Sequence, residues 1–141
     1  MGIGGCAACK FVSDLPDGIA RCRASRTEAA VPALRRDRPV PFLCHMGFAC
    51  VSMPALPGTG LGFTLTFGPY CPDEAPQGVE QDALWGLSDL GLNPEDGLPV
   101  SLADIRLNSA DAVTAVAEWT SDSLRALWKA LQAPAEAPAS D

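Results

Sequence analysis

The chain has 141 residues, of which 48% are hydrophobic and 19% charged, so it is long enough to bury a core as a single domain. Lys and Arg number 10 against 17 Asp and Glu, and the resulting net charge of −7 argues against nucleic acid as a partner, because such a surface repels phosphates. No apolar run reaches the ~20 residues that span a bilayer, which argues against a membrane as well.

The first residues, MGIGGCAACK, contain neither the basic nor the apolar region of a signal peptide, and they predict a cytoplasmic location. In that reducing compartment, the six cysteines are more often thiols, redox centres or metal ligands than parts of a disulfide framework. Cysteine chemistry is therefore the main functional clue in the composition.

The first predicted element is a helix over residues 18–36. Ser25 and Glu28 have the spacing of a capping box, and Pro32 lacks the backbone donor that a helix interior needs. The proline therefore predicts a break or a restart of the helix at Pro32.

Three strands are predicted next. The short apolar segments 40–44 and 48–55 meet at a sharp corner, and after a turn the segment 61–68 alternates strictly between apolar and small or polar residues. This alternation is typical of a half-buried strand in an antiparallel hairpin. The residues on its apolar face are Leu61, Phe63, Leu65 and Phe67.

A Pro-rich loop over 68–78 carries Cys71, and a helical stretch follows it. A longer amphipathic helix is expected at about 109–132, with an apolar stripe that packs on its own sheet or on a second copy of the chain. We expect one domain over 1–132, followed by a low-complexity, disordered tail over 133–141.

Cys6 and Cys9 form a C-x2-C pair, a spacing that lets two thiolates chelate one ion from a single turn. Cys22, Cys44 and the two remaining cysteines do not form a second such pair, so the fold must assemble any complete set of ligands. For Cys44 and Cys50, a role as small buried hydrophobic residues stays open.

His45, the only histidine, follows Cys44 directly. A nucleophilic Cys44 activated by His45 would require the chain to bend there, because neighbouring strand residues point to opposite faces. A structural or ligand role for His45 is favoured. Motifs of phosphate-binding loops, dinucleotide-binding folds, α/β-hydrolases and zinc proteases are absent from the sequence, and no catalytic activity of its own is predicted.

The spacing Cys9-x12-Cys22-x21-Cys44, the motif CHMGF, the segment ACVSMP and the hairpin GLGFTLTFGPY together resemble the PocR-type sensory domain, a PAS- or GAF-like ligand-binding module of bacterial regulators. The resemblance covers roughly residues 9–131. It implies an α+β fold, with a small antiparallel sheet flanked by helices and a long C-terminal helix. It also implies a sensory role and a ligand or cofactor site near the three matching cysteines and His45.

The chain also departs from the pattern of that family. Family members usually have a helix and strands before the first matching cysteine, so we expect a domain shortened at its N-terminus. Cys50 stands where the family tends to have an acid, and Cys6 and Cys71 are additions. A shortened sheet would expose an edge, which predicts a homodimer or a complex with a protein partner.

We therefore predict a metal centre held by four cysteines, with an iron–sulfur cluster of the [4Fe–4S] type favoured and zinc as the alternative. The predicted ligands are Cys6, Cys9, Cys22 and Cys44. Further cofactor contacts are predicted for His45, Cys50 and Cys71, with Cys71 the first substitute for Cys6.

The predicted function is a stand-alone sensory domain that signals by protein contact. Three alternatives remain open from the sequence: a small iron–sulfur accessory subunit of a redox enzyme complex, a small-molecule sensor without metal, and a thiol enzyme.

Overall fold

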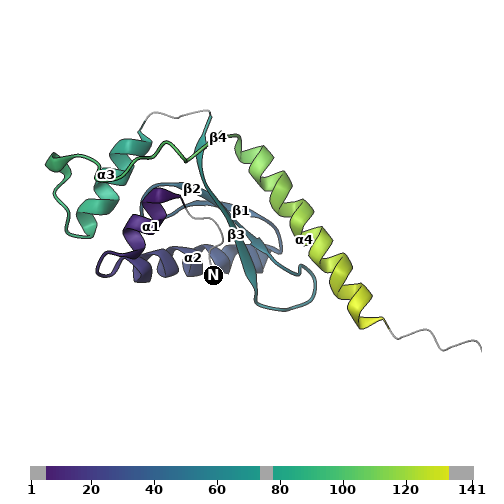
Figure 1. Ribbon diagram of the computed structural model, residues 1–141. Helices are drawn as coiled ribbons and strands as arrows, with labels where there is room; N and C mark the ends of the chain where they lie inside the picture. Colours follow the sequence, from purple (N-terminus) through teal and green to yellow (C-terminus); the bar gives the residue numbers. More distant parts are fainter. Residues whose placement is uncertain (1–5, 74–77, 134–141) are drawn as a thin grey trace, which may run out of the picture.

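The computed structural model describes residues 6–73 and 78–133, and most of the tail expected at 133–141 lies outside them. Its elements confirm the α+β class and the long final helix (Figure 1). In chain order they are α1 (Ala7–Ser13), α2 (Gly18–Arg36), β1 (Val40–Leu43), β2 (Ala49–Pro54), β3 (Thr64–Pro72), α3 (Val79–Asp89), the 3₁₀ helix η1 (Pro94–Asp96), β4 (Leu107–Asn108) and α4 (Ala110–Gln132).

The sheet has the order β1-β2-β3-β4. Its first three strands are antiparallel neighbours, as predicted, but β4 runs parallel to the end of β3, with Cys71 opposite Leu107. The sheet is therefore mixed rather than purely antiparallel. Helix α2 packs on one face and α4 on the other, while α1 and α3 lie toward one end (Figure 1).

The central strand β2 is buried along its whole length because both of its faces are covered. Ala49, Val51 and Met53 point to the α4 side, where they form a core with Tyr70, Val113 and Ala117. The alternate residues, Cys50 and Ser52, therefore point to the α2 side. Strand β2 thus separates the core on the α4 side from the interior on the α2 side, which is lined by different residues.

One buried hydrogen bond fastens α4 to the end of β2. The Ser121 hydroxyl donates to the carbonyl oxygen of Pro54 at 2.7 Å, and the Ser121 side chain is fully buried. We expect Ser121→Ala to lower the free energy of unfolding by about 1–2 kcal/mol, because the Pro54 carbonyl would lose its partner without gaining water.

Urea unfolding followed by circular dichroism measures this loss. Ser123→Ala is the matched control, since the Ser123 hydroxyl is exposed and donates only within its own helix, to Trp119. That variant should stay within about 0.5 kcal/mol of the wild type. Equal losses in both variants would mean that the Ser121 bond adds nothing specific.

Helix α2 runs without interruption from Gly18 to Arg36, so the break predicted at Pro32 is wrong. Ala29 and Ala33 on either side of Pro32 are buried, and this packing stabilises the helix across the proline. The predicted capping box is wrong as well. Ser25 lies inside the helix, and its hydroxyl accepts the backbone N–H of His45 at 3.0 Å.

Two further boundaries differ from the sequence-based prediction. Strand β3 begins at Thr64, leaving Phe63 outside it with 63% of its surface exposed. At the other end, β3 continues through Cys71, which was predicted to lie in a loop. The backbone N–H of Cys71 donates to the carbonyl of Arg106 at 2.9 Å, so pairing with a distant segment extends the strand.

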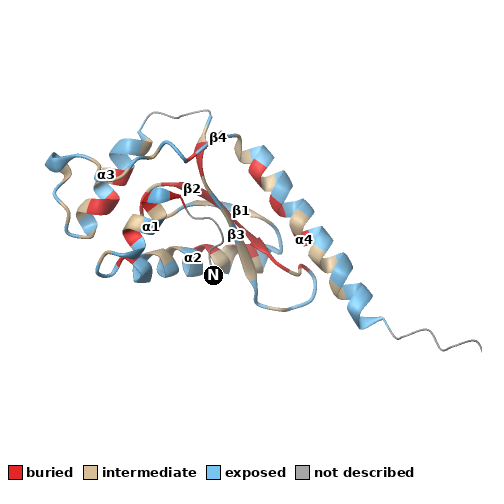
Figure 2. Ribbon diagram, viewed as in Figure 1, coloured by how far each residue is buried: buried red, intermediate tan, exposed pale blue. Residues whose placement is uncertain are grey.

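A second core lies at the end of the sheet near α1 and α3 (Figure 2). Phe48 lies at its centre and is 1% exposed, with Val12 of α1 and Leu87 of α3 among the buried residues around it. This core supports the sharp corner between β1 and β2.

Among the described residues, no helix is both long and apolar enough to cross a membrane.

Candidate functional site

The C-x2-C pair forms the start of helix α1. The backbone N–H of Cys9 donates to the Cys6 sulfur at 3.4 Å, so Cys6 takes the N-cap position that Ser, Thr, Asp or Asn usually occupies. The two sulfur atoms lie 3.2 Å apart. The helix thereby holds the two thiols as a pair, as the spacing predicted.

The corner after β1 positions Cys44 and His45. The Cys44 N–H donates to the carbonyl of Phe48 at 3.0 Å, and the Gly47 N–H donates back to the carbonyl of Cys44 at 2.8 Å. Gly47 has φ of +76°, and a Cβ there would lie 2.5 Å from the Cβ of Asp82. Only glycine fits such a position, so the backbone of the corner requires the glycine of the motif CHMGF.

Four thiols line one small cavity of about 60 Å³ between α1, α2 and the sheet. They come from four different parts of the chain: Cys9 from α1, Cys22 from α2, Cys44 from the corner and Cys50 from β2. Gly68 brings β3 close to them, since a Cβ there would lie 3.1 Å from the Cys50 sulfur.

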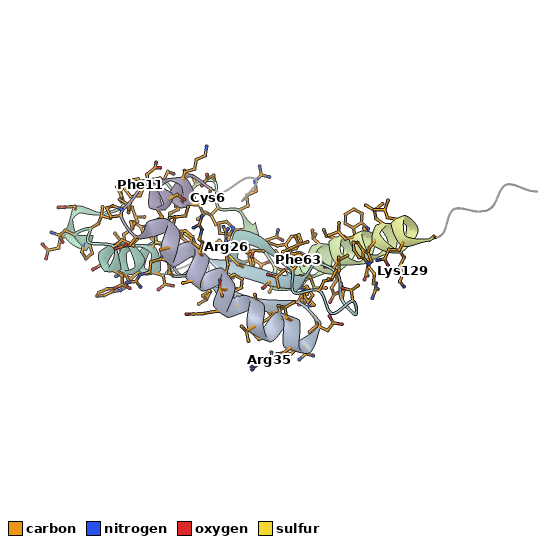
Figure 3. The ribbon with its side chains drawn as sticks, turned by 90° about the horizontal axis from the view of Figure 1, so that it is seen from below. Cys6, Phe11, Arg26, Arg35, Phe63 and Lys129 are labelled. Carbon is orange, nitrogen blue, oxygen red and sulfur yellow. The ribbon has the colours of Figure 1, made fainter. Side chains whose placement is uncertain are left out.

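The cavity brings together three of the four predicted metal ligands. Cys6 does not line it but touches Cys9, and Cys50 takes part instead. Arg26 of α2 also lines the cavity, and Figure 3 labels its side chain. The remaining lining is mainly apolar and includes Phe42 and Phe48.

In two pairs of cysteines, the hydrogen bond between the thiols lowers the pKa of one member and raises the pKa of the other. The Cys50 thiol donates to Cys44, and with the backbone N–H groups of the corner it lowers the pKa of Cys44 to about 6, while the pKa of Cys50 is raised. In the same way, the hydrogen bond with Cys9 lowers the pKa of Cys6 to about 7, and the pKa of Cys9 is raised. The lowered pKa of Cys44 favours its thiolate, the form that binds metals and attacks electrophiles.

His45 does not pair with Cys44, the partner considered for a nucleophile. Its Nε2 atom lies 3.2 Å from the sulfur of Cys22, and burial together with Arg21 lowers the pKa of the imidazole. Burial also raises the pKa of Cys22. The contact joins two residues 23 positions apart, and no feature of the sequence marks it.

A larger groove of about 460 Å³ lies beside this contact, between α2 and β1. Arg21, Glu28, Cys44 and His45 are its charged or titratable residues, whereas Val40 and Phe42 supply apolar surface. The groove shares Ser25, Phe42 and Cys44 with the thiol cavity. The two hollows are therefore neighbours.

Cys71 lies apart from the thiol cavity. It is buried on β3 and lines another hollow, of about 340 Å³, with Val79, Leu98 and Ile105 among its neighbours. Among residues 6–73 and 78–133, no three Cys, His, Asp or Glu side chains form a group that could hold a single metal ion.

Comparison with known proteins adds one finding. A family model described as the sensory domain found in PocR matches residues 2–131, which include all six cysteines and nearly all of α4. The match begins ahead of Cys9, the first residue on which the resemblance rested. Neither a curated protein nor a solved structure matches the chain.

Proposed function

Since the chain belongs to the family of PocR sensory domains, we propose that it senses its signal through an iron–sulfur cluster bound by the thiols of the small cavity. It passes the signal on by contact with another protein. The observation that carries this proposal is the convergence of Cys9, Cys22, Cys44 and Cys50 from four elements on one hollow. Thiols that merely fill a core have no need to share one cavity.

Zinc and an iron–sulfur cluster place their sulfur ligands at different spacings. Sulfur ligands around one zinc ion lie about 3.8 Å apart, because the Zn–S bonds of about 2.3 Å point to the corners of a tetrahedron. In a cluster, each thiolate binds a different iron, so the sulfur atoms stand further apart. No group that could hold a single ion occurs among the described residues, and a cluster does not need such a compact group.

The charges around the cavity also suit a cluster. An iron–sulfur core with four thiolates is an anion, and Arg26 contributes a cation to the lining. The lowered pKa of Cys44 means that this ligand is ionised before iron arrives. Phe42 and Phe48 limit access of water, which protects a cluster from hydrolysis.

Anaerobic purification followed by iron, zinc and acid-labile sulfide analysis tests the proposal. We expect a brown protein with iron and sulfide each near about four per chain, and with a broad visible absorption that bleaches on reduction. Zinc without sulfide would contradict the cluster and leave a structural metal site. A colourless, metal-free protein would contradict any sensing mechanism that depends on a bound metal.

One observation favours a second function, the sensing of a small organic molecule without metal. The groove between α2 and β1 has a volume within the range of small-molecule sites, and Arg21 and His45 could orient a polar group against the apolar wall. Metal-free protein with a melting temperature that rises in the presence of a small organic ligand would support this function. Loss of that rise on Arg21→Ala would locate the ligand in the groove, because Arg21 lines the groove and not the thiol cavity.

A further inference from the structure

Helix α4 has two apolar sides, of which only one is covered. Val113, Ala117 and Ser121 are buried against the sheet. The other side is open, and four large side chains on it are Val116, Trp119, Leu127 and Leu131, with exposed fractions of 55%, 71%, 56% and 75%. We call these four residues the outer face of α4. Figure 2 shows the largely exposed surface of the helix away from the sheet.

Two polar residues lie among the four residues of the outer face, and both have hydrogen-bond partners. The hydroxyls of Thr120 and Ser123 donate at 2.8 Å to carbonyls of their own helix, those of Val116 and Trp119. Burying these hydroxyls would therefore leave no donor unpaired. At 100° per residue, the charged residues of the helix fall on the opposite side. They are Asp111, Glu118, Asp122, Arg125 and Lys129.

The outer face supplies a large part of the surface that an interface between two copies needs. Its four side chains expose on the order of 500 Å² of apolar surface, more than half of the about 800 Å² per partner that a standard interface buries. The helix also extends past the sheet. Ser121 contacts Pro54 at the end of β2, and the following residues continue outward to Lys129, beyond Phe63 at the hairpin (Figure 3).

We propose that the outer face of α4 binds the same face of a second copy, with the two helices antiparallel around a two-fold axis near Ser123. This arrangement places Thr120 opposite Leu127 of the second copy and Val116 near the level of its Leu131. Ser123 is small, so the helices can approach closely at the axis. Leu127 near the axis thereby meets the smaller Thr120.

The helix dipoles favour the antiparallel order over the parallel one. Each helix carries a partial positive charge at its N-terminus and a partial negative charge at its C-terminus, and antiparallel helices bring opposite ends together. The charged side chains do not enter this choice, because they lie on the side of α4 away from the outer face, where Arg125 pairs with Asp122 at 3.0 Å.

The edge of the sheet is a poorer surface for the same purpose. Pairs bonded across β1 and β2 include Cys44 with Phe48, so by alternation the backbone of Pro41 points away from β2, toward the open edge. Proline has no N–H to donate to another strand, which blunts pairing there. The dimer expected from the sequence is therefore assigned to α4.

Sedimentation equilibrium of the full chain over a range of concentrations tests the proposal. We expect a dimer, and Leu127→Glu should raise its dissociation constant by more than about tenfold, because a charge would be buried in the interface. Val31→Glu is the matched control, since Val31 is also an exposed apolar residue of a helix, at 45%, but lies on α2. That variant should dimerise as the wild type does.

The proposal would be overturned by a wild-type monomer at all concentrations, or by Leu127→Glu and Val31→Glu acting alike. A photoreactive benzoylphenylalanine in place of Thr120 determines the orientation. Cross-linking into the peptide that contains Leu127 of the second copy is expected, while cross-linking to the peptide around position 120 would mean parallel helices. None of these outcomes depends on metal, so they are independent of the test of the cysteine site.

Discussion

Replacing Cys44 by alanine is expected to lower the iron and sulfide bound per chain at least about tenfold, because it removes the ionised thiol at the centre of the proposed site. Cys22→Ala should have a similar effect, since Cys22 is the one thiol that α2 contributes to the cavity lining. Iron and acid-labile sulfide analysis of anaerobically purified variants measures both losses. Retention of the full metal content by either variant would contradict the proposed cluster site.

Cys71→Ala is the matched control for these variants. Cys71 is as buried as Cys6, at 8% exposure, but it lines a different hollow. The control should therefore keep its iron while losing the same chemical group. A loss of iron equal to that of Cys44→Ala would place Cys71 in the ligand set, as the sequence-based prediction allowed.

Comparing Cys6→Ala with Cys50→Ala identifies the fourth ligand. Cys50 lines the cavity with the other three thiols, whereas Cys6 reaches the site only through Cys9. We expect Cys50→Ala to lose most of its iron and Cys6→Ala to keep more. The reverse result would restore the set predicted from the C-x2-C pair and leave Cys50 as the hydrogen-bond donor to Cys44.

The second large effect is expected for Gly86→Ala, at the contact between α3 and the corner that carries Cys44 and His45. A Cβ at Gly86 would lie 2.8 Å from the His45 carbonyl oxygen and 2.9 Å from the Cα of Met46. Both are backbone atoms, which cannot rotate away. We expect the free energy of unfolding to fall by about 1–3 kcal/mol, as in other overpacked interiors.

The sign of this effect makes the test specific. Alanine in the interior of a helix is ordinarily more stable than glycine by about 1 kcal/mol, so helix propensity alone predicts a gain. Gly62→Ala is the control, because a Cβ at Gly62 would meet nothing within 4 Å. Urea unfolding of the two variants gives the difference. A Gly86→Ala protein as stable as the wild type would mean that α3 does not hold the corner in place.

The elements that the sequence predicted best are those whose signals are local and long. Helices α2 and α4 were expected at 18–36 and about 109–132, and they span Gly18–Arg36 and Ala110–Gln132. Their patterns extend over several turns, so single contrary residues such as Pro32 did not hide them. Helix α1 was missed because its N-cap is a thiol, a residue type that does not mark helix starts.

The parts of the site that depend on strand pairing were harder to predict. The spacing of Cys9, Cys22 and Cys44 indicated that these residues belong together, and the structure places them around one cavity. The position of Cys50 opposite them depends on the face that β2 turns to α2, and on the irregular pairing with β3 near Gly68. Such long-range pairing leaves no mark in the spacing of the residues.

The two interiors of the molecule are separated by the thickness of a single strand. Cys50 faces the thiol cavity, and its chain neighbours Ala49 and Val51 face the core that holds α4. Any shift of the β2 backbone at Cys50 must therefore also move Ala49 and Val51, the residues one peptide bond away against which α4 packs. Movement at the cavity can reach the helix through covalent bonds alone, with no intervening side chain to transmit it.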